Sequence, residues 1–124
     1  ANINFVGLKS HVEAMDVLKK SSIAVFPSLC YEGFPLSLLE AMAFGKPVIA
    51  SDLGPRSEIV ENNVTGLLFK AGDHNDLKNK AMKLINHEEF TSRFSSNARA
   101  KYLAKYTSEK NYDLLIKIYE ALLN

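Results

Sequence analysis

The sequence predicts an α/β fold in which helices pack on a doubly wound sheet of parallel strands. Short apolar, β-leaning runs recur in the first 69 residues of the 124-residue chain, as at 23–26 and 47–50. Apolar residues at helical spacing fill the segments between these runs. Beyond residue 69 only helical patterns remain, so we expect the sheet to be followed by a helical C-terminal tail.

The predicted elements alternate along the chain, as they do in βαβ units. Strands are expected near residues 3–6, 23–27, 47–50 and 66–69. Helices are expected over about 12–20, 35–44, 56–61, 73–86, 90–106 and 108–124. Helices on both faces of the sheet would then bury its apolar strands.

Local signals mark where the helices begin and end. Ser10 and Glu13 have the spacing of a capping box at the start of the first helix. Pro35 stands where a first helical residue would, and the N–H that it lacks would have no intrahelical acceptor there. Gly45 ends the same helix, and Pro47 prevents it from continuing.

Two glutamates flank the start of this helix. Glu32 lies on the loop after the strand at 23–27, and Glu40 lies on the helix itself. Ligands of parallel sheets bind beyond the carboxyl ends of the strands, so both carboxylates are expected near one crevice. A surface glutamate on an amphipathic helix is the alternative for Glu40, but its neighbours are apolar on almost every side. For Glu32 the alternative is a loop carboxylate stabilised by a helix N-terminus.

Four blocks of sequence carry a resemblance to a known family. They are NFVG at 4–7, PS followed by EGFPL within 27–36, EAMAFGKPVIA at 40–50, and Glu58 with NVTGLL at 63–68. In this order and spacing they resemble the donor-binding half of retaining GT-B glycosyltransferases of the group 1, or family 4, type. Glu32 and Glu40 match the E-x7-E motif of that family. Pro35 stands where many relatives have glycine, which is a small departure.

The resemblance implies that residues 1–124 are part of a Rossmann-like C-terminal domain that binds a nucleotide-diphosphate sugar. An upstream part of this domain and an N-terminal acceptor domain are then missing, which agrees with a chain that opens almost directly in a predicted strand. The implied activity of the full-length enzyme is transfer of a glycosyl group, of hexosyl type, to an acceptor with retention of the anomeric configuration. The isolated fragment is expected to be inactive.

The resemblance also implies roles for individual residues. Glu40 is expected to accept the ribose hydroxyls of the nucleotide, and Glu32 to act beside the transferred sugar as the candidate catalytic residue. A front-face route is implied, in which Glu32 is not a covalent nucleophile. The backbone N–H groups of Gly33, Phe34 and Leu36 are expected to bind the donor near the helix start, where anions bind.

Composition excludes several other classes of protein. The formal charge of +1 argues against nucleic-acid binding, and no apolar run is long enough to span a bilayer. The single cysteine, Cys30, fits a reducing cytoplasm and is expected to be a small buried apolar residue. His11, His74 and His87 lack the spacing of metal ligands, so no cofactor and no metal is expected beside the donor substrate. Peripheral membrane association of the full-length enzyme is compatible with the family.

Two other interpretations stay open at this point. One is a GT-B relative with different chemistry, such as a sugar-nucleotide epimerase or a phosphorylase, although no pyridoxal lysine is found in a suitable context. The other is a non-catalytic, flavodoxin-like binding or regulatory module, which predicts no nucleotide binding. Titration with a nucleotide diphosphate separates the second interpretation from the enzymes. The sugar, the base and the acceptor are not defined by these residues.

Overall fold

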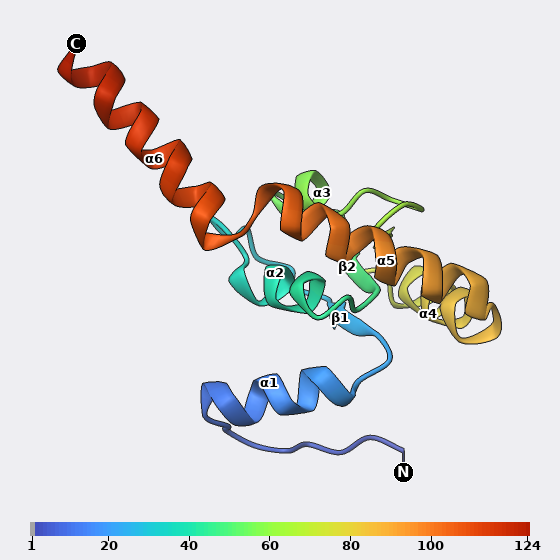
Figure 1. Cartoon of the computed structure of the whole chain (residues 1–124). Helices are drawn as coiled ribbons and strands as arrows, with labels where there is room; N and C mark the ends of the chain where they lie inside the picture. Colours follow the sequence, from blue (N-terminus) through green and yellow to red (C-terminus); the bar gives the residue numbers. More distant parts are fainter. Residues whose placement is uncertain (1) are drawn as a thin grey trace.

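A computed structural model of the chain describes residues 2–124. Three parallel strands form one sheet in the spatial order β1–β2–β3, and helices pack around it (Figure 1). This is the α/β architecture with a helical tail that the sequence predicts. In chain order the elements are α1 (His11–Lys20), β1 (Ala24–Phe26), α2 (Leu36–Ala43), β2 (Val48–Ser51), α3 (Arg56–Ile59), β3 (Gly66–Phe69), α4 (His74–Asn86), α5 (Glu88–Lys105) and α6 (Ser108–Leu123).

The central strand, β2, is buried along its whole length and is apolar on both faces. In the parallel register Ile49 lies between Val25 of β1 and Leu67 of β3. Side chains alternate along a strand, so Val48 and Ala50 point to one face of the sheet and Ile49 points to the other. Helices therefore have to cover both faces, as they do in doubly wound folds.

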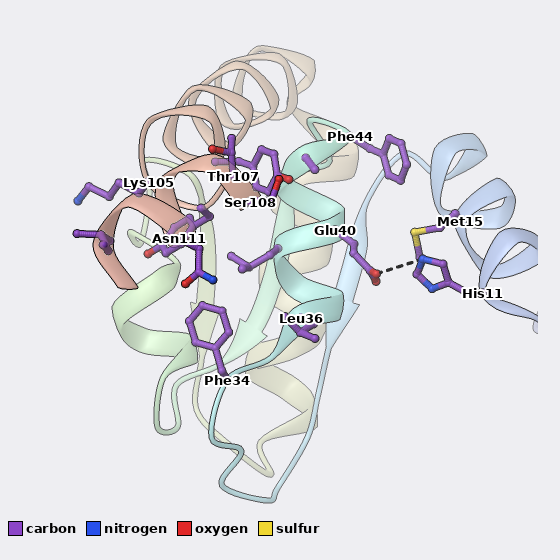
Figure 2. A pocket seen from close by; sticks show the side chains of 15 residues that line it. His11, Met15, Phe34, Leu36, Glu40, Phe44, Lys105, Thr107, Ser108 and Asn111 are labelled. Carbon is purple, nitrogen blue, oxygen red and sulfur yellow. Dashed lines mark ion pairs between the residues drawn. The ribbon is translucent and has the colours of Figure 1, made fainter. Parts of the chain in front are cut away.

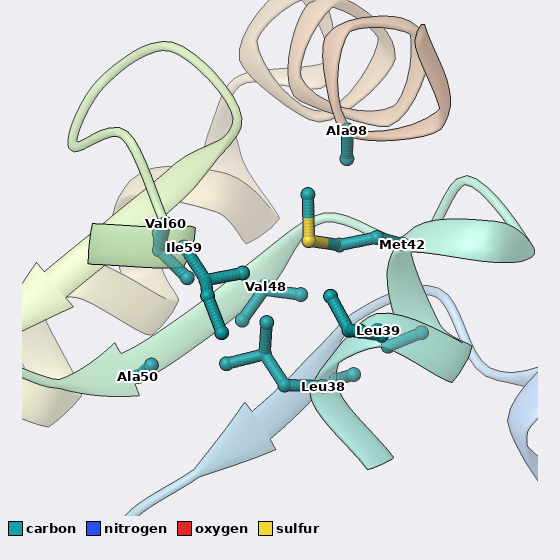
Figure 3. Close-up of a cluster of buried hydrophobic side chains, with 10 residues drawn as sticks. Leu38, Leu39, Met42, Val48, Ala50, Ile59, Val60 and Ala98 are labelled. Atoms are coloured by element: carbon teal, nitrogen blue, oxygen red, sulfur yellow. The ribbon is translucent and has the colours of Figure 1, made fainter. Parts of the chain in front are cut away.

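The helix α2 covers the first face (Figure 3). Its apolar side chains pack against β1, β2, the end of α3 and one residue of α5, and each large side chain buried in this way stabilises the fold by about 1.5–3 kcal/mol. This packing fixes the helix that carries Glu40. The buried residues of the cluster are Ala24, Leu38, Leu39, Ala41, Met42, Val48, Ala50, Ile59, Val60 and Ala98.

A second cluster of buried residues covers the opposite face. It joins β2 and β3 to α4 and α5, and the ring of Phe90 stacks on that of Phe94 at a centroid distance of 6.0 Å. Helices thus lie on both faces of the sheet, which confirms the doubly wound arrangement. The buried residues of this cluster are Ile49, Leu67, Phe69, Leu84 and Phe94.

The strand predicted near residues 3–6 is wrong. Residues 2–10 are neither strand nor helix, and the side chain of Phe5 is 95% exposed. A strand requires a neighbouring strand that pairs with its backbone N–H and C=O groups. Within the described residues the sheet contains only β1, β2 and β3, so the local β pattern at 3–6 has no partner.

The helix α1 begins at the predicted capping box. The Glu13 N–H donates to Ser10 Oγ at 3.3 Å, and the Ser10 N–H donates to a carboxylate oxygen of Glu13 at 2.8 Å. These hydrogen bonds lower the pKa of the Glu13 carboxyl, and the one from the Ser10 backbone N–H contributes most. The cap fixes the start of α1 and with it His11, the first helical residue.

The last helix, α6, extends away from the sheet (Figure 1). Thr107 caps it by accepting a hydrogen bond from the Lys110 N–H at 3.3 Å. Apolar side chains along α6, such as Tyr119 and Leu122, are exposed. Within residues 2–124, no helix is both long and apolar enough to cross a lipid bilayer.

Candidate functional site

The loop between β1 and α2, residues 27–35, carries the first of the two glutamates. Glu32 lies on this loop, beyond the carboxyl end of β1, and its side chain is 46% exposed. The structure thus places this carboxylate at the edge of the sheet where ligands of parallel sheets bind. Cys30 on the same loop is exposed, so the expectation of a buried cysteine is wrong. The loop runs over the surface, where a small apolar side chain has no core to enter.

Arg56, the first residue of α3, is buried beside this loop and only 1% exposed. Its Nη1 donates to Glu32 Oε2 at 3.1 Å. Its Nη2 donates to the backbone carbonyls of Cys30, at 2.9 Å, and of Ser28, at 3.3 Å. A single guanidinium therefore joins the carboxylate and two backbone groups of the 27–35 loop.

Two further contacts attach the same loop to the end of β2 and to the turn that follows it. Ser51 is fully buried, and its Oγ donates to the carbonyl of Ser28 at 2.7 Å. The ring of Tyr31 lies against Gly54, so that a Cβ on Gly54 would be 3.0 Å from Tyr31 Cδ1. Gly54 also has a φ of +60°, which favours glycine. The loop that carries Glu32 is held at several points.

The N-terminus of α2 follows directly on this loop. Pro35 is the N-cap and the helix begins at Leu36, one residue later than the sequence predicts. N–H groups in the first turn of a helix have no intrahelical acceptor and can bind an anion. Gly33 and Phe34 precede this turn, and the ring of Phe34 lies 6.4 Å from that of Tyr106. The side chains of Phe34 and Leu36 are exposed rather than packed in the core.

Glu40 lies on the second turn of α2 and is 33% exposed at its side chain. It extends toward α1, where its Oε1 is 3.6 Å from His11 Nε2 (Figure 2). It also lines a pocket of about 770 Å³ formed by α1, α2 and the junction of α5 with α6. The lining residues are His11, Met15, Phe34, Leu36, Leu39, Glu40, Ala43, Phe44, Tyr102, Lys105, Tyr106, Thr107, Ser108, Asn111 and Leu114.

The structure brings some of the predicted donor-binding residues together. Phe34, Leu36 and Glu40 line the same pocket. Gly33 and Glu32 lie on the loop that leads into α2, and the carboxylate of Glu32 is paired with Arg56. The two carboxylates thus have different surroundings, because one faces a histidine on α1 and the other a buried guanidinium.

Sequence reasoning assigned no role to Arg56 or to His11. A signal for Arg56 was present, because Arg56, Ile59 and Val60 have the i, i+3, i+4 spacing of a buried helix face. An arginine on such a face needs partners, and these came from a loop more than twenty residues away. The contact of His11 with Glu40 had no local signal, since it depends on how α1 packs beside α2.

The arrangement offers acceptors for hydroxyl groups and donors for an anion. Glu40 presents a carboxylate inside a mostly apolar pocket, and the start of α2 presents backbone N–H groups. Within residues 2–124, no group of three or more His, Cys, Asp or Glu side chains is arranged to hold a metal ion. Such a site can bind a polyhydroxylated, anionic ligand.

Comparison with known proteins identifies the family. The model of the family described as glycosyl transferases group 1 matches residues 1–101 of the chain. An uncharacterised glycosyltransferase of Methanocaldococcus jannaschii is 38% identical over 122 residues, which are 98% of this chain and 34% of that protein. A poly(ribitol-phosphate) α-N-acetylglucosaminyltransferase of Staphylococcus aureus is 33% identical over 93 residues. These are 73% of this chain and 19% of that protein.

Solved structures agree with this assignment. A sucrose-phosphate synthase from Thermosynechococcus elongatus superposes on this chain with a TM-score of 0.88 at 31% sequence identity. The match covers 97% of this chain and 30% of the synthase chain. Anabaena HepE in complex with UDP and glucose gives a TM-score of 0.84 at 25% sequence identity. The match covers 94% of this chain and 32% of the HepE chain. The chain spans about a third of the length of these proteins. It belongs to the glycosyl transferases group 1 family, with the fold of a GT-B domain fragment.

Proposed function

We propose that this chain is the donor-binding part of a retaining glycosyltransferase. In the full-length protein it would bind a nucleotide-diphosphate sugar and present the glycosyl group, of hexosyl type, to an acceptor. The observation that carries the proposal is the position of Glu40, a carboxylate that lines a mostly apolar pocket close to the start of α2. Membership of the glycosyl transferases group 1 family supports it.

Glu40 is the group that we assign to the ribose of the donor. Its side chain is two-thirds buried, and a histidine imidazole at 3.6 Å is the partner that the structure gives its carboxylate. A pair of vicinal hydroxyls satisfies a carboxylate with two hydrogen bonds, each strengthened by the charge. The apolar lining from Leu39 and Phe44 gives the adjacent base a surface to contact.

The start of α2 is the group that we assign to the diphosphate. The N–H groups of Gly33, Phe34 and Leu36 lie where the positive end of the helix dipole favours negative charge. Glu32 would then contact the transferred sugar, through its hydroxyls or through the positive charge that develops at the anomeric carbon. In this proposal Glu32 is the catalytic residue and forms no covalent intermediate.

The rest of the proposal concerns what surrounds this chain. We assign it to the C-terminal domain of a protein in which an upstream part of the domain and an N-terminal acceptor domain complete the site. The proposed enzyme works without a metal or a cofactor, with the donor sugar as its substrate, and acts in the cytoplasm, with peripheral contact to a membrane where the acceptor requires it. No nucleic acid takes part.

Replacing Glu40 with alanine is expected to weaken nucleotide binding. Losing hydrogen bonds to a charged group should raise the dissociation constant of UDP by roughly 10- to 100-fold, with kcat little changed. Calorimetric titration of the full-length protein with UDP, and with GDP in parallel, measures this.

The matched control for this variant is Glu89→Ala. Glu89 is also a helical glutamate beside a histidine, with Oε1 at 3.5 Å from His87 Nδ1, but it lies on α5 and away from the pocket. The control should bind UDP as the wild type does. Wild-type binding by Glu40→Ala, or equal weakening in both variants, would contradict the assignment, and no binding of either nucleotide by the wild type would favour a non-catalytic module.

The 124 residues alone are expected to be catalytically inert. A diphosphate needs cationic partners. Lys46, which follows α2 in the sequence, donates to the carbonyl of Lys19 at the far end of that helix, and Lys105 is the lysine that lines the pocket. A helix dipole alone contributes only about 0.3–2 kcal/mol, so nucleotides should bind at about millimolar concentration or more weakly. Donor hydrolysis by the purified fragment, measured against a Glu32/Glu40 double variant, tests this, and turnover above that variant would contradict it.

A further inference from the structure

Arg56 cannot touch a ligand, although it contacts the proposed catalytic loop. Its side chain is only 2% exposed, and both Nη atoms donate hydrogen bonds to protein acceptors. Whatever it does for the reaction must therefore act through the groups that it holds.

All the acceptors of Arg56 lie on one short stretch of the 27–35 loop. They belong to Ser28, Cys30 and Glu32, which lie within five consecutive residues of the loop. The guanidinium fork is planar and rigid, so it fixes the carboxylate of Glu32 relative to two carbonyls of its own backbone. Ser51 adds a hydrogen bond to the same carbonyl of Ser28. The orientation of Glu32 thus follows from Arg56.

An arginine buried at this position has a cost in stability. Its Nε is buried without a hydrogen-bond partner among the described residues, which destabilises the folded state. An apolar side chain of similar length would avoid that defect, but it would leave the carboxylate of Glu32 and the carbonyls of Ser28 and Cys30 without this donor. The charge of the guanidinium is used at Glu32, and its fork joins that carboxylate to the carbonyls of Ser28 and Cys30.

We propose that Arg56 is a positioning residue for Glu32, an inference that rests on the proposed function. Arg56 binds Oε2 of Glu32 and so directs the other carboxylate oxygen, Oε1, toward the donor sugar. The effect of Arg56 is therefore expected in turnover rather than in donor affinity. It should also vanish when Glu32 no longer carries a carboxylate.

A double-variant cycle in the full-length protein tests this. Hydrolysis of UDP-glucose, UDP-N-acetylglucosamine and GDP-mannose is measured, and the donor that the wild type turns over fastest is used. Arg56→Met should lower kcat by roughly 10- to 100-fold and leave the donor KM within about threefold. Arg56→Lys should be intermediate, because an ammonium reaches fewer acceptors than the guanidinium fork. Arg56→Met combined with Glu32→Gln should lose no more than Glu32→Gln alone.

The matched control is Lys101→Met. Lys101 is also a basic residue with a mostly buried side chain, 9% exposed, and its Nζ lies 2.8 Å from Glu61 Oε1, away from the proposed donor site. This control should keep the wild-type kcat below its melting temperature. Equal losses of kcat in Lys101→Met and Arg56→Met would overturn the proposal, as would additive losses in the cycle or an unchanged kcat in Arg56→Met. If Arg56→Met does not fold, Arg56→Lys takes its place in the cycle.

A measurement on the protein without the donor sugar separates this inference from the proposed function. Amide hydrogen exchange of residues 28–34 should be faster in Arg56→Met than in the wild type, with exchange in β2 unchanged. Unchanged exchange in this loop would overturn the positioning role even in an active enzyme. If exchange is faster in Arg56→Met but the wild type neither binds UDP nor hydrolyses any donor, the proposed function is rejected, together with the catalytic part of this inference.

Discussion

Glu32→Gln is expected to lower the kcat of donor turnover by roughly 100-fold in the full-length protein, with the donor KM within about threefold of the wild type. The amide keeps the shape of the side chain and removes its charge. If Glu32 stabilises positive charge at the anomeric carbon, that interaction is strongest in the transition state, so its loss appears in kcat. Steady-state kinetics with the donor that the wild type hydrolyses fastest measure both quantities.

Glu61→Gln is the matched control for this variant. The side chain of Glu61 is about as exposed as that of Glu32, at 51% against 46%, and it also pairs with a basic residue whose side chain is mostly buried, Lys101. It lies away from the proposed donor site, so its variant should retain the wild-type kcat. A wild-type kcat in Glu32→Gln, or a loss confined to KM, would remove Glu32 from the catalytic role.

Gly66→Ala is expected to destabilise the fold by about 3 kcal/mol or more. A Cβ on Gly66 would overlap the backbone carbonyl oxygen of Val48, its register partner in β2, and would approach Val60 Cγ1 to 3.2 Å. The backbone of the buried central strand cannot move aside as a flexible side chain can. Urea denaturation of the full-length protein measures the change in the free energy of unfolding.

Gly33→Ala is the control for the effect on stability. A Cβ on Gly33 would have no heavy atom within 4 Å, and its φ is not in the left-handed region. The free energy of unfolding should therefore change by less than about 0.5 kcal/mol. Equal stabilities of the Gly66→Ala and Gly33→Ala variants would show that β3 does not lie against β2 as described.

Much of the fold could be predicted because its signals are local. The capping box of Ser10 and Glu13 marks the start of α1, and apolar runs mark β2 and β3. The run at 3–6 has the same local pattern but no strand beside it, so the pattern alone could not decide its structure. Strand formation depends on a partner strand, which can be distant in sequence, whereas a cap depends on residues three positions apart.

The candidate site was less predictable for a related reason. The sequence placed Glu32 on a loop and Glu40 on a helix, and the structure has them there. Their partners, Arg56 and His11, come from elements that tertiary packing brings close. Charged residues that meet across long separations leave no periodic signal, although the burial pattern around Arg56 offered one clue.

The proposed donor site is tested most directly by chemical-shift titration of the isotope-labelled, full-length protein with UDP. We expect the largest changes at the amides of Gly33, Phe34, Leu36 and Glu40, and none of comparable size in α4. These changes should saturate at one nucleotide for each chain. Saturable changes confined to other elements, with the start of α2 unaffected, would contradict the account.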